Sequence, residues 1–152
     1  VYKANKLIEE GKCLKEVVEY LEDIKGDIAF YGALDTLENA IKGGRVNPIA
    51  GKLINALNFK VIIEISEGLV KPIDKARGEG NSMKKLFEKV KNNVHDIKNK
   101  TLVIGHSNCK EKAEKIAKHI EENYEHKDII ISSIGPVMGT YTSEGAILIA
   151  VL

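Results

Sequence analysis

Hydrophobic residues in the first part of the chain recur with helical spacing. Val1 to Glu10 and Leu14 to Lys25 each place apolar side chains on one stripe, and Gly11 and Gly26 follow the two segments. Apolar positions three and four residues apart lie on one face of a helix, and glycine commonly ends a helix. The pattern predicts a helical hairpin over residues 1–26 that leads into a single domain spanning residues 1–152.

Further along, short runs rich in β-branched and apolar residues predict strands. The sequence Glu67-Gly68 separates two such runs, and a two-residue connection with glycine second is a strong signal for a β-hairpin. Pro72 has no N–H to donate, so the second strand of that hairpin is expected near a sheet edge. The expected strands are residues 27–34, 59–66, 69–75, 101–105, 129–134 and 146–152.

Two longer amphipathic segments predict the helices that cover this sheet. One is expected to start at a cap formed by Asn81 or Ser82, and the other to run from Cys109 to about Tyr124 between two strands. A strand, a helix and a strand at this spacing predict a βαβ unit with a right-handed crossover. Gly135 to Gly145 is expected to be a glycine-rich loop. The predicted fold is α/β (α+β), a two-layer sandwich built on a mixed sheet of five to six strands.

The segment from Asp35 to Gly51 has the most distinctive local pattern. It predicts a short helix over residues 36–42, a corner at Gly43-Gly44, and a second helix over Ile49–Leu57 that is capped by Asn47 and opened by Pro48. Adjacent glycines tolerate positive φ, and proline suits the first turn of a helix. Arg45 is therefore expected between the end of one helix and the start of another, where free N–H groups favour an anion.

Composition makes that arginine stand out. The chain has 23 basic residues, of which only Arg45 and Arg77 are arginines, and each lies beside a glycine. Arginine gives planar, two-pronged recognition of carboxylate or phosphate that lysine does not reproduce. Two arginines beside turns are equally compatible with incidental surface positions, so the pattern alone leaves both interpretations open.

Charge and cysteine content narrow the functional classes. A formal net charge of +1 gives no support for bulk electrostatic binding of nucleic acid or of an anionic membrane. No apolar run is long enough for membrane insertion. Two cysteines are too few for a disulfide scaffold and suit a reducing cytoplasm. The four histidines are scattered without the spacing of a zinc site, so no metal or other cofactor is expected.

Four motifs in order resemble the DegV family of bacterial fatty-acid-binding proteins, over nearly the whole chain. They are D-T-L-E-x(4)-G-G-R at residues 35–45, K-A-R-G at 75–78, I-G-H-S-N at 104–108 and I-G-P-V-M-G-T-Y-T-S-E-G-A at 134–146. The resemblance is to the family's C-terminal domain. The family's N-terminal α/β domain has no counterpart here.

The resemblance implies a lipid carrier that performs no chemistry itself. It would shield a long-chain fatty acid and present the carboxylate to a separate fatty acid kinase. By the same resemblance, Arg45 supports the head-group network, Arg77 meets the kinase, and the helix over residues 49–57 and neighbouring strands line the tail pocket. A family histidine is replaced here by Tyr141, which can donate a hydrogen bond but is not cationic near neutral pH.

The hydroxyl groups of Thr140 and Thr142 flank Tyr141 and complete the predicted ligand-binding set. In the family, the serine and threonine that contact the head group lie in the N-terminal domain. An isolated half-site would leave apolar walls open, which favours a homodimer of this domain as one arrangement.

Two other functions remain open from the residues. Arg45, His106 and Cys109 could serve an enzyme acting on a small anionic metabolite, with the helix dipole lowering the thiol pKa of Cys109. Alternatively, the lysine-rich helices could contact an acidic partner in a domain that binds no small ligand.

Overall fold

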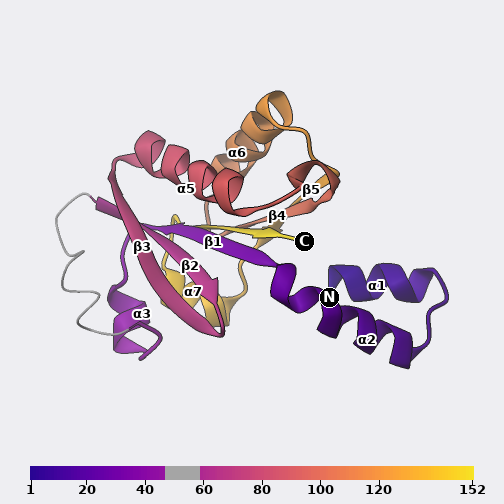
Figure 1. Ribbon diagram of the computed structural model, residues 1–152. Helices are drawn as coiled ribbons and strands as arrows, with labels where there is room; N and C mark the ends of the chain where they lie inside the picture. The colour runs from indigo at the N-terminus through magenta and orange to yellow at the C-terminus, as the bar shows by residue number, and fades with distance from the viewer. Residues whose placement is uncertain (47–58) are drawn as a thin grey trace.

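Six strands form one sheet in the order β3-β2-β1-β6-β4-β5 (Figure 1). The computed structural model describes residues 1–46 and 59–152. Only β4 and β5 pair in parallel; every other neighbouring pair is antiparallel. The strands are β1 (Ala29–Leu34), β2 (Phe59–Ser66), β3 (Leu69–Arg77), β4 (Thr101–His106), β5 (Asp128–Ser133) and β6 (Ile147–Val151). The predicted mixed sheet is confirmed, with six strands.

The β2–β3 hairpin forms where the sequence predicts it. Glu67 and Gly68 both have positive φ, at 54° and 73°, which is the backbone conformation of a two-residue hairpin turn that matches the twist of the strands. Pro72 lies on β3, at the edge of the sheet, beside a shift in register between Ile62 and Ile63. Edge strands and irregularities of register are the places where a sheet tolerates proline.

Helices lie on both faces of the sheet. The two long helices α5 and α6 cover one face, and the short helices α3 and α7 lie against the other (Figure 1). The helical elements are α1 (Tyr2–Glu9), α2 (Leu14–Ile24), α3 (Glu38–Lys42), α5 (Glu79–Asn93), α6 (Lys110–Asn123) and α7 (Pro136–Thr142), with short 3₁₀ turns at Lys25–Asp27 and Ile97–Asn99. The βαβ unit predicted from the sequence is β4-α6-β5.

The start of α5 differs from the prediction. The helix begins at Glu79 with Gly78 as its N-cap at φ 78°, so the cap is not Asn81 or Ser82. Both of these side chains instead donate hydrogen bonds backward, Asn81 to the carbonyl of Arg77 and Ser82 to that of Glu79. Glycine suits this cap because its φ is unfavourable for a residue with a Cβ.

The segment predicted as a long loop, Gly135 to Gly145, also differs, because most of it forms α7. Pro136 occupies the first turn, where its fixed φ suits a helix and its missing N–H costs nothing. Gly139 lies inside the helix and accepts the backbone N–H of Ser143. Glycine content favoured a loop, but the proline start and packing against α3 favour a helix.

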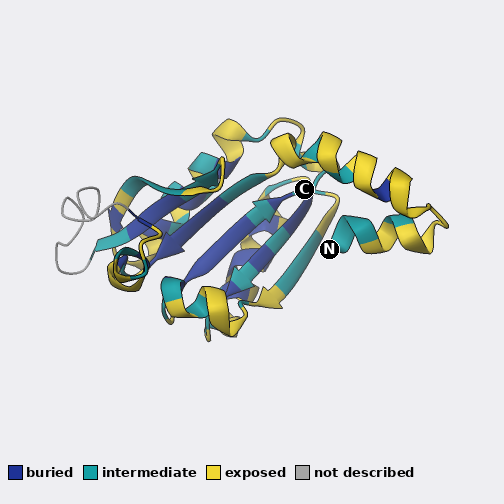
Figure 2. Cartoon of the chain, turned by 90° about the horizontal axis from the view of Figure 1, so that it is seen from below, coloured by how far each residue is buried: buried dark blue, intermediate teal, exposed yellow. Residues whose placement is uncertain are grey.

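Two apolar clusters, one on each face of the sheet, pack the helices against the strands. The larger joins β1, β2, β4 and β6 to the inward stripes of α5 and α6. The smaller lies beneath α3 and α7 and includes Leu34, Leu37, Val61, Ala146 and Leu148. Figure 2 shows buried strand residues on this second side, where the helices cover only part of the sheet.

The N-terminal hairpin lies at the far end of the sheet from α3 (Figures 1 and 2). In α1 no residue is buried, and in α2 only Val17 is buried. The predicted apolar stripe is therefore largely uncovered: Leu14 is 80% exposed and Val18 is 49% exposed.

The second helix of the distinctive segment, expected over Ile49–Leu57 with Asn47 and Pro48 at its start, lies outside the described residues. Among the described residues, no helix combines the length and the apolar content needed to cross a bilayer.

Candidate functional site

Sheet topology brings the sequence motifs to one end of the sheet. The antiparallel pairings make β1, β3, β4 and β5 run in the same direction, so their C-terminal ends meet at one edge. The segments after these strands carry the four motifs: Asp35 with α3, Arg77 with Gly78, Ser107 with Asn108, and Ile134 with α7. This is the edge where α/β sheets commonly bind ligands.

The glycine corner after α3 is a Schellman motif. Gly44 has φ 70°; its N–H donates to the carbonyl of Ile41, and the N–H of Arg45 donates to that of Ala40. These two bonds satisfy carbonyls that a helix end leaves without partners, and they require a left-handed residue at the glycine position. The backbone of Arg45 is therefore fixed by the corner that precedes it.

The Arg45 side chain is held by two further contacts. Its guanidinium donates a 2.8 Å hydrogen bond to the carbonyl of Gly43 and lies 4.7 Å from the centroid of the Tyr141 ring. A guanidinium over an aromatic face gains about 0.5–1 kcal/mol at an exposed site. These two contacts fix the position of the exposed guanidinium, which has further N–H groups to donate. Such an arrangement suits recognition of a planar anion.

The Tyr141 ring fits against α3 because position 43 is a glycine. A Cβ placed on Gly43 would lie 2.3 Å and 2.8 Å from two ring carbons of Tyr141. A second link between α3 and α7 is the 3.1 Å hydrogen bond from the Asn39 amide to the Ser143 hydroxyl. Gly43 thus has two functions, since its carbonyl holds Arg45 and its missing side chain admits Tyr141.

The two threonines beside Tyr141 are placed differently from one another. Thr140 is exposed and its hydroxyl donates to the carbonyl of Pro136, while Thr142 is buried and donates to that of Met138. Both hydroxyl protons are therefore directed into the helix itself. In this arrangement neither hydroxyl proton is directed toward a ligand, and the donors of the site are Arg45 and Tyr141.

The smaller apolar cluster adjoins the Arg45–Tyr141 pair. Tyr141 packs against this cluster, together with partly buried side chains from β1, β2 and β3 such as Phe30, Ile65 and Val70. A fixed cation thus lies beside an apolar cluster that is buried at its centre and bordered by partly buried side chains. An amphiphilic anion has this combination of charge and apolar length.

Arg77 lies apart from this pair. It is the last residue of β3, is exposed, and pairs with Phe59 of β2 across the edge of the sheet. Its carbonyl accepts the Asn81 amide at the start of α5. The position is open to solvent at the same end of the sheet, as contact with another protein requires.

The three residues of the enzyme alternative, Arg45, His106 and Cys109, do not come together in one site. Alternation along β4 places His106 with Ile104 on the α5–α6 face, and Arg45 lies with Tyr141 on the other. His106 is buried with no hydrogen-bond partner for Nδ1 within the described structure. Burial raises the pKa of the Cys109 thiol, which donates to the carbonyl of Ala146 at 3.5 Å. The net direction is therefore opposite to the lowering expected from the helix dipole, which argues against an activated thiolate.

Local sequence patterns do not predict the contacts that connect the motifs. Lys60 pairs with Asp35, and the position of a Cβ on Gly145 would be 3.1 Å from the Asp35 carboxylate. Lys112 donates to the carbonyl of Gly145 at 2.8 Å. The one hint in the sequence is that Asp35 and Gly145 each belong to one of the four family motifs, at residues 35–45 and 134–146.

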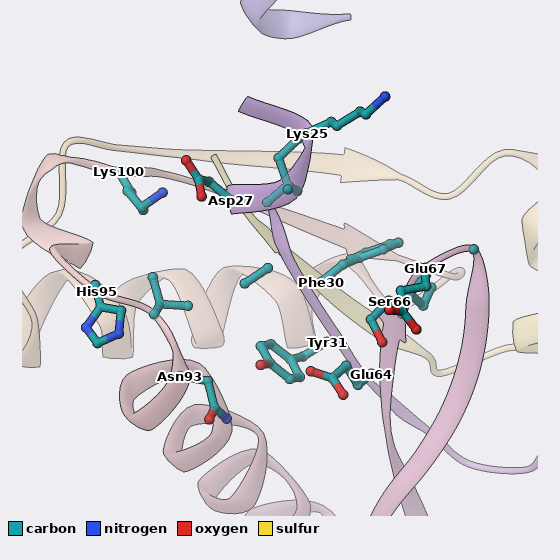
Figure 3. Close-up of a pocket in the computed structure, with 16 residues that line it drawn as sticks. Lys25, Asp27, Phe30, Tyr31, Glu64, Ser66, Glu67, Asn93, His95 and Lys100 are labelled. Atoms are coloured by element: carbon teal, nitrogen blue, oxygen red, sulfur yellow. The ribbon is translucent and has the colours of Figure 1, made fainter. Parts of the chain in front are cut away.

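A separate hollow of about 900 Å³ lies at the opposite end of the sheet (Figure 3). The Tyr31 ring and the Glu64 carboxylate lie side by side there, and Asn93 points in from the end of α5. Burial, and secondarily Glu64, raise the pKa of Tyr31. Neither Arg45 nor Tyr141 lines this hollow. Within the described ranges, no three His, Cys, Asp or Glu residues come together as metal ligands.

Comparison with known proteins identifies the family. The sequence matches a family described as "Uncharacterised protein, DegV family" over residues 1–152. A DegV domain-containing protein of Clostridium perfringens is 31% identical over 150 residues, covering 98% of this chain and 52% of the relative. The chain therefore spans about half the length of that relative.

Solved structures share the fold. A DegV family protein from Eubacterium eligens loaded with heptadecanoic acid superposes with a TM-score of 0.87 at 25% identity, covering 98% of this chain and 54% of that one. The Streptococcus pneumoniae fatty acid kinase B3 protein, loaded with linoleic acid, gives a TM-score of 0.88 at 24% identity, covering 98% and 53%. The second likeness concerns the fold alone.

Proposed function

The chain belongs to the DegV family, and on that premise we propose that it forms part of a carrier for a long-chain fatty acid. The observation that carries this proposal is the Arg45–Tyr141 pair, which places a fixed cation 4.7 Å from the centroid of an aromatic ring that itself packs against a buried apolar cluster. A related structure of 25% identity is loaded with heptadecanoic acid.

The acyl chain and the carboxylate of such a ligand contribute differently to the binding free energy. Burial of an acyl chain is worth about 0.8 kcal/mol per methylene, or on the order of 10 kcal/mol gross. A hydrogen bond to a charged group adds roughly 1.5–3 kcal/mol. Burial of the acyl chain would therefore supply most of the affinity, and Arg45 with Tyr141 would select the carboxylate.

In this proposal the chain catalyses no reaction. It presents the fatty acid carboxylate to a separate fatty acid kinase, and Arg77 lies on the surface that meets the kinase. The exposure of Arg77 and its position at the same end of the sheet as Arg45 support this assignment. Thr140 and Thr142 would donate to the carboxylate by turning their hydroxyl protons away from the carbonyls of Pro136 and Met138.

The experiment is native mass spectrometry of the complete protein purified from cells. We expect a co-purifying species with the mass of a C16 to C18 fatty acid, and stoichiometric uptake of added fatty acid after delipidation. The absence of both would contradict the proposal.

A further inference from the structure

A groove runs between α5 and α6, on the face of the sheet opposite Arg45. Its volume is about 720 Å³, and its floor is apolar, formed by Met83, Phe87, Ile116 and Tyr124. The rings are packed together: the Phe87 centroid lies 5.2 Å from that of His119 and 6.4 Å from that of Tyr124. This gives a firm apolar floor at the surface of the molecule.

The rim of the groove is predominantly positive. The charged side chains that line it are four lysines and two glutamates: Lys84, Lys91, Lys112, Lys115, Glu79 and Glu88. A mostly cationic rim around an apolar floor complements an apolar surface bordered by carboxylates.

The rim lysines differ from most other lysines on the same two helices. Outside the groove, Lys85 pairs with Asp74 at 2.7 Å and Lys118 with Glu122 at 3.8 Å, whereas Lys89 makes no salt bridge within the described structure. Within the described part of the chain, no salt bridge joins Lys84, Lys91 or Lys115 to a carboxylate. These three charges are thus available to a partner.

We propose that this groove binds an acidic amphipathic helix of a partner protein. On α5 the lining residues extend from Glu79 to Lys91, which at 1.5 Å per residue is about 18 Å, or three helical turns. A helix lying in such a groove inserts apolar side chains at i, i+4 and i+7. Its flanking carboxylates meet the lysines. The inference is independent of fatty acid binding, because it depends only on the α5–α6 face.

The test uses a defined probe, an 18-residue fluorescein-labelled helical peptide with leucine at i, i+4, i+7 and i+11 and mainly glutamate elsewhere. Fluorescence anisotropy at low salt is expected to give saturable binding to the intact protein. A matched peptide with lysine in place of glutamate should bind at least 10-fold more weakly. So should a peptide with alanine in place of leucine.

Variants of the protein locate the site. Lys84→Glu with Lys115→Glu should weaken the acidic peptide at least 10-fold, and Lys84→Ala with Lys115→Ala should have a smaller effect in the same direction. The control is Lys118→Glu, since Lys118 is on α6 but does not line the groove; it should change the affinity less than twofold. Circular dichroism checks that each variant is folded.

Three results would overturn the proposal. The acidic peptide could bind no more tightly than the lysine peptide, or Lys118→Glu could weaken it as much as the rim variants do. Alternatively, phosphatidylglycerol vesicles could bind in a manner that depends on Lys84 and Lys115 while the peptide does not, which would assign the groove to a membrane surface.

Discussion

The guanidinium of Arg45 lies over the ring of Tyr141, 4.7 Å from its centroid, while donating to the carbonyl of Gly43. One residue follows α3 and the other is on α7, so the contact joins two motifs that are far apart in the sequence. The same ring would collide with a side chain at position 43. Arg45, Tyr141 and Gly43 therefore act as one unit.

Replacement of Gly43 by alanine tests this unit. The new Cβ would lie within 2.3 Å of the Tyr141 ring, and overpacking of this kind typically costs 1–3 kcal/mol. We expect a loss of about that size in the free energy of urea unfolding. Gly26→Ala is the matched control, since no atom lies within 4 Å of a Cβ there. If Gly43→Ala were as harmless as the control, or if Tyr141→Ala failed to relieve its effect, the packing described would be wrong.

The two cysteines should react at different rates. Burial raises the pKa of the Cys109 thiol, whereas Cys13 is exposed. Since the thiolate is the nucleophile, iodoacetamide at pH 8 should modify Cys13 at least several-fold faster than Cys109. Mass spectrometry of peptides from a time course measures both rates in one sample. Faster modification of Cys109 would restore the enzyme hypothesis that the structure argues against.

Tyr31 should make stability depend on pH in the alkaline range. Its pKa is raised above the ordinary value of 10.0, chiefly by burial and then by Glu64. The folded state therefore holds the phenolic proton more tightly than the unfolded state. This contribution is complete below pH 10 and is lost as the pH rises through the higher folded pKa.

Tyr31→Phe isolates this effect from that of the other titrating groups. Urea unfolding at pH 9 and at pH 11 should show a smaller loss of stability for Tyr31→Phe than for the native protein. Equal losses would mean that Tyr31 titrates alike in the folded and unfolded states.

Arg77 should affect transfer to the kinase and leave lipid binding intact. Its side chain is exposed at the end of β3 and makes no contact with the Arg45–Tyr141 pair among the described interactions. Arg77→Glu is expected to slow acyl phosphate formation by a fatty acid kinase at least 10-fold, with fatty acid affinity unchanged within twofold. Lys71→Glu, also on β3, is the control. A parallel loss of fatty acid affinity would place Arg77 in the ligand site instead.

Much of the fold was accessible from the sequence because the strands have clear local signals. Glu67-Gly68 fixed a hairpin, and the apolar runs gave all six strands to within a few residues. The glycine corner at Gly44 was predictable for the same reason, since left-handed backbone is costly for other residues.

Tertiary contacts explain what the sequence did not predict. Glycine and hydroxyl residues predicted a loop from Gly135 to Gly145, yet a proline in the first turn, together with packing on α3, favours α7. Leu14 and Val18 have helical spacing but lie on an uncovered face, and spacing alone does not indicate what covers a stripe. The Arg45–Tyr141 contact also depends on long-range packing, which no local pattern encodes.

The central claim is that Arg45 binds the carboxylate of a long-chain fatty acid. Isothermal titration of the delipidated complete protein with palmitic acid and with its methyl ester tests it most directly. We predict that the acid binds at least 10-fold more tightly than the ester, as expected for a charged hydrogen bond worth roughly 1.5–3 kcal/mol, and that Arg45→Gln abolishes this difference. Equal affinities for acid and ester in the native protein, or a preference that Arg45→Gln leaves unchanged, would contradict the account.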